Sequence, residues 1–455
     1  MGGLGPLRLR PSGSAQRERW WLLGLLLLSC ATTSTVQLTE RERAAVLMQR
    51  GDAKSAVPIL EDLHAHAAND WALARALAEA HVKAGSAQAL LERLKTADTA
   101  VSHYMQGLVL FARASDATGP AIAEFQRAVE LEPAAGELHH RLGVALLESE
   151  KYEAARAPLE RAVQLQPNEL SWRLPLAKVL YRQGDSKGAV AALALVVQGS
   201  PTPQDVKVAR ALMDQIADPF AGFPQAARGT LEQGIQWLQV ADVPQQAIIS
   251  FEEILHDYPD LAVVHALLGL AYQRIDDAGR AVDELKRAIE LAPDDGKAHL
   301  YLGELYLSHQ RPKQAKEELE KALQLNPLLD DAYVRLGDLA LDRRDFVSAR
   351  RYFKALSAIA PDSVAAHGKL ALVYQLEGDW PAADRELHLV VDKDPDNAEF
   401  ILRLGVLHTE RFTKAKTAEE RKTASAEAAK WLQKVLEKQP DNAIASRALE
   451  TVNAR

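Results

Sequence analysis

Apolar residues recur at intervals of three and four positions along almost the whole chain after residue 37. This spacing places them on one face of an α-helix, so the pattern predicts amphipathic helices and not strands. Short polar segments rich in Gly and Asp lie between successive helices, as at 183–185, 276–279 and 377–379. Such segments favour tight turns. The chain is therefore predicted to be a series of helix-turn-helix units.

Prolines mark the ends of these units at a constant interval. Six of the seven intervals between neighbouring prolines of the series equal the thirty-four positions from Pro133 to Pro167, and only the interval from Pro201 to Pro259 is longer. Because a proline ring clashes with the preceding helical turn, each proline is predicted to end the second helix of its unit. A period this regular indicates a repeat architecture in place of several unrelated domains. The series consists of Pro133, Pro167, Pro201, Pro259, Pro293, Pro327, Pro361 and Pro395.

Glycines recur at a second fixed position, inside the first helix of a unit. A glycine within a helix costs about 1 kcal/mol relative to alanine. Its recurrence at one phase therefore requires a packing reason, and close approach of the two helices provides one. The column consists of Gly143, Gly269, Gly303, Gly337 and Gly405.

These columns, together with others of Leu, Tyr and Ala, resemble the tetratricopeptide repeat, whose pattern is matched well by 136–169, 262–295 and 296–329. The resemblance covers most of the chain from about residue 37 onward. It implies an all-α fold, a right-handed α-solenoid or superhelix of about eleven tetratricopeptide helix-turn-helix repeats. The repeats are expected to start near residues 37, 71, 102, 136, 170, 228, 262, 296, 330, 364 and 398.

Departures from the period define the predicted organisation of the chain. The long interval before Pro259 contains an extra segment, which forms either a hinge between two arrays or the remnant of a half-repeat. An insertion near 413–427 is predicted to extend the helices of the last repeat into solvent. The expected segments are a signal peptide at 1–29, a tether at 30–36, an N-terminal array at 37–203, a spacer helix with a Pro/Phe breaker at 204–227, a C-terminal array at 228–442 and a capping helix at 443–455.

The N-terminus has the pattern of an export signal. Four arginines precede the apolar run from Trp20 to Leu28, which is too short to span a bilayer. The segment ending in Cys30 resembles the lipobox of bacterial lipoproteins, which implies lipid attachment at Cys30. Ala31 in place of aspartate then implies an outer-membrane anchor with the body in the periplasm or at the surface. Secretion to the periplasm without lipid, an uncleaved anchor and an inert Cys30 are the alternatives.

Composition and charge exclude several classes of protein. The chain is 47% hydrophobic and 25% charged, as is typical of a folded soluble protein. Of the 54 Lys+Arg and 62 Asp+Glu in the whole chain, four arginines and one glutamate belong to the segment 1–29, which leaves 50 and 61 beyond it. The resulting charge of −11 argues against nucleic acid as a partner.

Motifs for catalysis or metal binding are absent from the sequence. It has no Gly-rich phosphate loop, no serine nucleophile elbow and no His-Glu-x-x-His helix. His139, His265, His299 and His367 lie four positions before the glycine column or its equivalent, which favours helix packing over metal binding. We therefore expect no enzymatic activity, no cofactor, no metal and no small-molecule substrate.

Cations recur two positions before the glycine column or its equivalent, at Arg141, Arg335, Lys369 and Arg403. Stacked repeats would align them in a row facing the groove, where they could receive an acidic peptide or an anionic glycan. The alternative is a row that is solvated or paired within the molecule. Acidic residues at Asp338, Asp342, Asp345 and Glu399 are near enough in sequence to neutralise it.

The resemblance implies a non-catalytic scaffold that binds partner peptides or helices in the groove of the repeats. With the lipobox, it implies a role in assembling an envelope complex, such as a secretin or pilus, outer-membrane proteins or the peptidoglycan machinery. An envelope component that binds an anionic polysaccharide, and a soluble scaffold with an inert N-terminus, are the alternatives.

Overall fold

The computed structural model describes residues 39–113, 118–199, 201–218 and 220–454. These residues form 24 α-helices and two short 3-10 helices, and no strand occurs among them. The described residues divide into two compact units, unit 1 up to Leu212 and unit 2 from Met213, and the boundary between them falls inside α12 (Pro203–Ile216). The predicted signal peptide, tether and lipid site at Cys30 lie outside the described residues.

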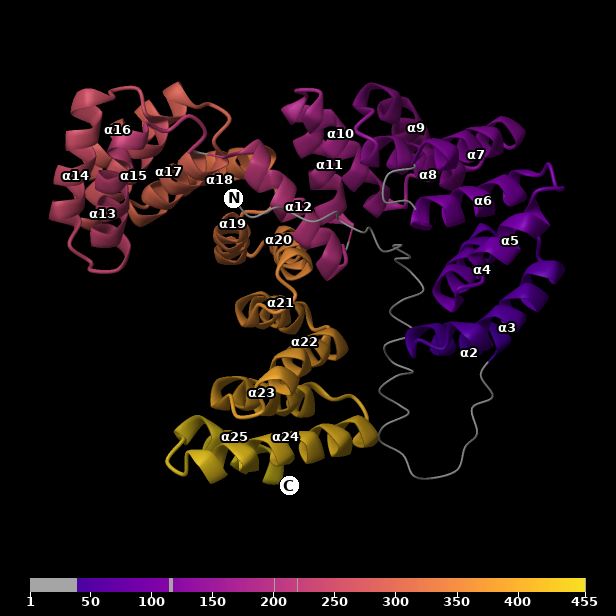
Figure 1. The fold of residues 1–455 in the computed structure, drawn as a ribbon. Coiled ribbons are helices and arrows are strands. Elements are labelled where there is room, and N and C mark those ends of the chain that lie inside the picture. The colour runs from indigo at the N-terminus through magenta and orange to yellow at the C-terminus, as the bar shows by residue number, and fades with distance from the viewer. Residues whose placement is uncertain (1–38, 114–117, 200, 219, 455) are drawn as a thin grey trace. The chain divides into compact units, whose positions relative to one another are not determined.

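Unit 1 contains five antiparallel helix pairs in chain order (Figure 1). The fifth pair is preceded by the 3-10 helix η1 (Leu170–Trp172), where the other pairs begin directly with an α-helix. The pairs are α2 (Glu40–Gln49) with α3 (Ala53–His66), α4 (Trp71–Ala84) with α5 (Ala87–Leu94), α6 (Ala100–Arg113) with α7 (Thr118–Leu131), α8 (Gly136–Glu148) with α9 (Tyr152–Leu165), and α10 (Arg173–Arg182) with α11 (Ser186–Gln198).

Unit 2 contains six further pairs and a final single helix, after the 3-10 helix η2 (Gln225–Ala227). The pairs are α13 (Arg228–Gln239) with α14 (Pro244–Asp257), α15 (Ala262–Arg274) with α16 (Ala278–Leu291), α17 (Gly296–Ser308) with α18 (Pro312–Leu325), α19 (Asp330–Asp342) with α20 (Phe346–Ile359), α21 (Val364–Glu377) with α22 (Trp380–Lys393), and α23 (Ala398–Lys414) with α24 (Ala418–Lys438). The last helix is α25 (Ala443–Asn453). The eleven pairs confirm the predicted all-α solenoid of helix-turn-helix repeats.

Each repeat is held together by close packing of its first helix on its second. A Cβ atom added to Gly303 would lie 2.8 Å from Cγ of Leu319, and one added to Gly269 would lie 2.7 Å from Cγ of Leu285. Both leucines are completely buried, so a glycine allows the second helix to approach. In the last repeat Gly405 faces Leu432 in the same way. The separation along the chain is greater there only because the insertion lies between the two residues.

Small residues on the second helix complete this contact. In most of the eleven repeats, one alanine at a fixed distance before the terminal proline has no exposed surface at all. A larger side chain at this column would force the packed helices apart, because protein interiors contain few voids. The column consists of Ala155, Ala189, Ala247, Ala281, Ala315, Ala349, Ala383 and Ala428.

The turn inside each repeat follows from two local features. In most repeats the first helix is followed by a residue in the left-handed region, for example Arg344 with φ 57° and Gly378 with φ 79°. In five of the repeats an aspartate then caps the second helix, as where the Asp345 carboxylate accepts a hydrogen bond of 3.1 Å from the Ser348 amide. Side-chain caps of this kind satisfy amides that the helix itself cannot.

The last repeat is longer than the others because its two helices continue past the usual turn. Helix α23 has 17 residues and α24 has 21, whereas the helices of the two preceding repeats have 13 or 14. Helix α25 packs on both of them through buried Ala445 and Val452, and the Ser425 hydroxyl donates to the Val452 carbonyl. Among the described residues, no helix combines the length and the apolar character needed to cross a membrane.

Candidate partner-binding surface

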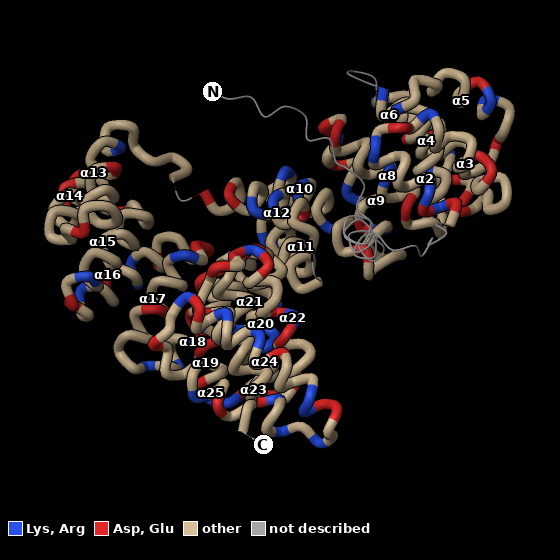
Figure 2. Tube along the Cα trace, turned by 90° about the horizontal axis from the view of Figure 1, so that it is seen from below, with Lys and Arg blue, Asp and Glu red and all other residues tan. Residues whose placement is uncertain are grey.

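The four predicted cations lie on the first helices of their repeats, Arg141 on α8, Arg335 on α19, Lys369 on α21 and Arg403 on α23. They occupy the same phase of the repeat but belong to two different units. Acidic and basic residues are interspersed along the helices of both units (Figure 2). Whether each cation is free to bind a ligand therefore depends on the acidic residues immediately around it.

In unit 2 the three cations are paired with carboxylates of this chain. Nε of Arg335 lies 2.8 Å from Oε1 of Glu304, and Nζ of Lys369 lies 2.7 Å from Oδ1 of Asp338. Both pairs connect a first helix to the first helix of the preceding repeat. Nη2 of Arg403 lies 2.7 Å from Oε1 of Glu399 on its own helix, and its guanidinium covers the Phe400 ring at 4.9 Å.

These pairs lie at the surface. The side chains of Arg335, Lys369 and Arg403 are 47%, 39% and 46% exposed. Exposed ion pairs contribute only about 0–1 kcal/mol, so they neutralise the row without fixing it rigidly. Of the acidic residues that lie near this row in the sequence, Asp338 and Glu399 pair with it, whereas Asp345 caps α20.

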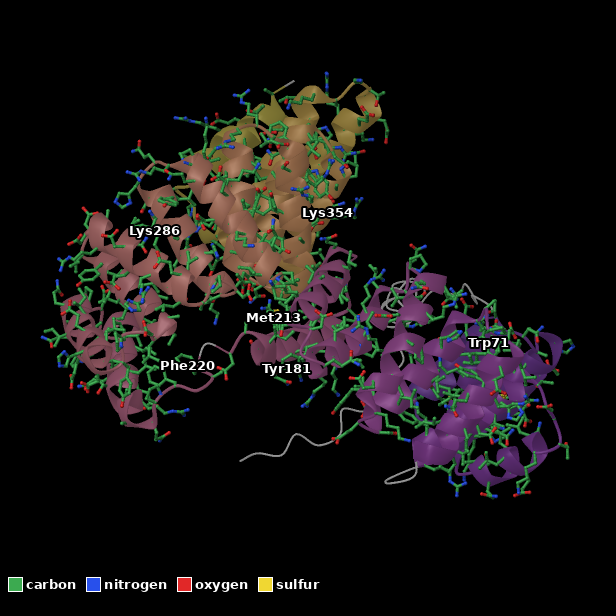
Figure 3. The ribbon with its side chains drawn as sticks, turned by 90° about the horizontal axis from the view of Figure 1, so that it is seen from above. Trp71, Tyr181, Met213, Phe220, Lys286 and Lys354 are labelled. Carbon is green, nitrogen blue, oxygen red and sulfur yellow. The ribbon has the colours of Figure 1, made fainter. Side chains whose placement is uncertain are left out.

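In unit 1 the corresponding cation is enclosed. The Arg141 side chain is only 16% exposed, and its Nε lies 2.9 Å from Oε1 of Glu137. The same oxygen accepts a 2.7 Å hydrogen bond from the hydroxyl of fully buried Tyr104, whose ring meets that of Trp71, labelled in Figure 3, edge to face at 5.3 Å. Nη1 of Arg75 lies 3.4 Å from the same Oε1 atom of Glu137. Arg141 therefore does not lie on an exposed row with the other three cations.

Burial makes this network electrostatically strong. Burial opposes ionisation of Glu137, but the charges of Arg141 and Arg75 and the Tyr104 hydroxyl outweigh it and lower the pKa of Glu137 to about 2. Burial, assisted by Arg141, lowers the pKa of His140 to about 3, so this ring is neutral near pH 7. The neutral ring stacks on Trp172 of η1 with centroids 4.7 Å apart.

Three of the four histidines of the column bind a carboxylate on the second helix of their repeat, a role that was not predicted from the sequence. Nδ1 of His367 lies 2.7 Å from Oε2 of Glu386 on the second helix of its repeat, and its Nε2 lies 3.1 Å from the carbonyl oxygen of Pro361. His265 and His299 contact Glu284 and Glu318 in the same way. Each glutamate lies 19 positions after its histidine, a spacing that is visible in the sequence. Nε2 of His139 lies 3.0 Å from the Pro133 carbonyl oxygen, and His139 forms no pair with a carboxylate among the described residues.

The histidines and carboxylates do not converge on a metal site. Over the described part of the chain, no group of three or more His, Cys, Asp or Glu side chains could hold a metal ion.

A surface feature without a distinct signal in the sequence lies on α21. Leu372 is 38% exposed and Leu376 is 52% exposed, although both belong to a well-packed helix. Nothing in the sequence separates them from core leucines, because α21 is apolar around most of its circumference. Only the packing of the neighbouring helices leaves one apolar side of α21 in solvent.

Two family models, each described as tetratricopeptide repeat, match the chain. One matches residues 119–169 and 140–206, and the other matches residues 275–337 and 340–404. The class of protein is therefore an α-solenoid of tetratricopeptide repeats, and such repeats are present in both units.

Solved structures with a similar arrangement include YrrB, described as a tetratricopeptide repeat protein with an unusual peptide-binding site. It is 20% identical and aligns over 44% of this chain and 97% of its own, with a TM-score of 0.38. PilF of Pseudomonas aeruginosa is 19% identical over 49% of this chain and 96% of its own, with a TM-score of 0.41. PilW, described as a type IV pilus biogenesis factor, is 18% identical over 50% of this chain and 99% of its own, with a TM-score of 0.40. No curated protein sequence matches the chain.

Proposed function

We propose that this protein is a non-catalytic scaffold that binds peptides or helices of partner proteins on the first-helix face of its repeats. The observation that carries the proposal is the presence of tetratricopeptide repeats in both units, since arrays of this kind offer extended binding surfaces. Leu372 and Leu376 support it, because they are exposed one helical turn apart on the same side of α21, and adjacent exposed apolar side chains are a feature of interaction sites.

We place the scaffold in the bacterial envelope, tethered by lipid at Cys30. This part of the proposal rests on the sequence, where a basic stretch and a short apolar run precede the chain's single cysteine. Lipid chains would hold the repeats at the outer membrane. There the scaffold would assist assembly of an envelope complex, for which a secretin or pilus, outer-membrane proteins and the peptidoglycan machinery are the candidates.

The tether is tested by the intact mass of the mature protein made in a Gram-negative host, together with membrane fractionation and a Cys30→Ser variant. The expected result is a mass equal to residues 30–455 plus acyl groups, and loss of both the acyl mass and the membrane association in the variant. An unmodified chain that starts at residue 1 contradicts the envelope assignment but leaves the scaffold function standing.

The scaffold function has its own test, which is photo-crosslinking in the same host from the first-helix face. A photoreactive residue at position 372 is expected to capture a defined partner protein, and one at position 389 on α22 serves as the matched control. Capture of the same set of proteins from both positions would contradict binding on the first-helix face.

An anionic polysaccharide is supported less well as the ligand. The cations that would bind it are Arg335, Lys369 and Arg403, and each already contacts a carboxylate of this chain within 2.8 Å. A polyanion would have to displace these carboxylates.

A further inference from the structure

Helix α21 presents a continuous stripe of side chains to solvent. Ala365, Lys369, Leu372 and Leu376 are separated by four, three and four positions, which places them on one side of the helix. The amino group of Lys369 is engaged by Asp338 of α19, whereas Leu372 and Leu376 remain exposed. We call these four residues the α21 stripe. Its uncovered part is apolar.

The two neighbouring first helices flank this apolar part with carboxylates. Asp342 on α19 lies one full repeat before Leu376, and Glu410 on α23 lies one full repeat after it, so all three share one phase. Within the part of the chain that the structure describes, neither carboxylate takes part in an ion pair. At this repeat position the three first helices therefore carry an acidic, an apolar and an acidic residue in turn, namely Asp342, Leu376 and Glu410.

Cations close to this row have other partners. Arg335, Lys369 and Arg403 contact Glu304, Asp338 and Glu399. Lys414, one helical turn beyond Glu410, lies over the ring of Trp380 at 4.9 Å. The cations that share the repeat position of Lys369 are thus paired within the chain, whereas Asp342 and Glu410 form no ion pair among the described residues.

We propose that Leu372 and Leu376 of the α21 stripe bind an apolar side chain of a partner segment whose basic residues contact Asp342 and Glu410. The proposal rests on the scaffold function proposed above and specifies the chemistry of its partner. The partner proposed here is basic, whereas the cation row in the sequence suggested an acidic partner. The difference arises because those cations pair with carboxylates of this chain, whereas Asp342 and Glu410 do not pair with cations of the described residues. Charge complementarity at the rim would select the partner, and the buried apolar side chain would supply most of the affinity.

The repeat geometry sets the spacing of the partner. Neighbouring helices pack with axes about 8–10 Å apart, and an extended chain advances about 3.3 Å per residue. An extended segment that crosses the three first helices therefore needs basic residues about three positions before and after its apolar residue. The peptide GGKAALAAKGG has this pattern and serves as the probe.

The experiment measures binding of the fluorescein-labelled peptide to the full chain by fluorescence polarisation, at low salt and at about 0.5 M salt. Binding is expected at low salt and is expected to weaken at high salt, because exposed charge pairs are screened. The double variant Leu372→Ser and Leu376→Ser is expected to weaken binding at least tenfold. The matched control combines Val347→Ser on α20 with Leu389→Ser on α22, both of which are exposed apolar residues outside the stripe.

A charge exchange separates specific binding from general stickiness. The double variant Asp342→Lys and Glu410→Lys should lose the lysine peptide and gain the matched peptide GGEAALAAEGG. Circular dichroism of every variant confirms that the repeats remain folded. Three outcomes overturn the proposal: no binding of the lysine peptide at about 1 mM, equal binding by the Leu372/Leu376 variant, or no exchange of preference. Crosslinking from position 372 would still report on the scaffold function in each of these cases.

Discussion

Arg141 in unit 1 and Lys369 in unit 2 occupy the same position of the repeat but have opposite environments. Arg141 is enclosed with Glu137, Tyr104 and Arg75, and its side chain is 16% exposed. Lys369 contacts Asp338 at the surface with 39% of its side chain exposed. The repeat thus determines the backbone position of a side chain, whereas the residues of neighbouring repeats determine whether that side chain is buried or exposed.

This difference in burial assigns different roles to the two ion pairs, one in stability and the other in binding. A buried ion pair is strongly destabilising to break, because the remaining partner keeps an uncompensated charge in a poorly solvated site. An exposed pair is nearly neutral for stability. We therefore expect the first-helix face of unit 1 to hold its repeats together near Glu137, and that of unit 2 near α21 to be available for partners.

The largest expected effect is on Glu137. The Glu137→Gln variant leaves Arg141 and Arg75 without their carboxylate, and we expect it to lower the free energy of unfolding of unit 1 by about 3–5 kcal/mol. Hydrogen exchange, followed by mass spectrometry on peptides from α8, measures the loss locally even if the two units unfold separately.

Asp338→Asn is the matched variant in unit 2. It removes the carboxylate partner of Lys369 at a site where 35% of the Asp338 side chain is exposed. We expect a loss below about 1 kcal/mol. Equal losses in the two variants would contradict the division between a buried network and a surface row.

Substitutions in the glycine column should lower the free energy of unfolding by similar amounts in both units, because each glycine contacts the second helix of its own repeat. Gly303→Leu places a side chain where even a Cβ would lie 2.8 Å from Leu319, and we expect a loss of at least about 1–3 kcal/mol. Gly143→Leu meets Leu159 and should lose a similar amount. Urea unfolding measures both.

Gly229→Ala is the control for this pair, because no atom lies within 4 Å of its added Cβ. A Gly303→Leu variant with the unfolding midpoint of the wild type would show that close helix approach does not explain the column.

The fold could be predicted almost completely from the sequence, because its determinants are local and periodic. The interval between Pro293 and Pro327 and the glycine at 303 follow from contacts inside one repeat, and these contacts recur with the period of the chain. The helix bounds of α17 and α18 agree with that period.

The surface could be predicted only in part. The enclosure of Arg141 depends on Tyr104 and Arg75, which belong to two earlier repeats and share no column with it. The exposure of Leu372 and Leu376 depends on which side of α21 the neighbouring helices leave uncovered. Periodicity locates such residues on a helix but does not describe their neighbours from other repeats.

A smaller effect is expected from the histidine column, with a dependence on pH. The hydrogen bond from His367 to Glu386, with that to the Pro361 carbonyl, raises the pKa of His367 against the effect of burial and of Lys393. The folded state then binds the proton more tightly than the unfolded state, in which the pKa is about 6.5. The stabilisation should be complete below about pH 6.5 and decline as pH rises through the higher pKa of the folded state.

Urea unfolding of wild type and His367→Gln between pH 5 and pH 9 tests this dependence, and the difference between the two proteins should shrink as pH rises. His139→Gln in unit 1 is the matched control. The position equivalent to Glu386 is Pro158 in that repeat, and Nε2 of His139 lies close to the Pro133 carbonyl oxygen. An identical pH curve for the two variants would show that the carboxylate partner is not responsible.

The smallest effect is expected at the turn, where the two units should not differ at all. Arg344 in unit 2 and Glu150 in unit 1 are exposed residues in the left-handed region, each with φ 57°. This conformation costs a residue with a Cβ about 1–2 kcal/mol, part of which glycine recovers despite its larger entropy in the unfolded chain. Arg344→Gly and Glu150→Gly should each raise the free energy of unfolding by about 0.5–1 kcal/mol, measured by urea unfolding. Gly378→Ala, at the equivalent turn of the repeat after Arg344, should lower the free energy of unfolding. A gain in one unit without the other would show that neighbouring repeats shape the turn as they shape the first-helix face.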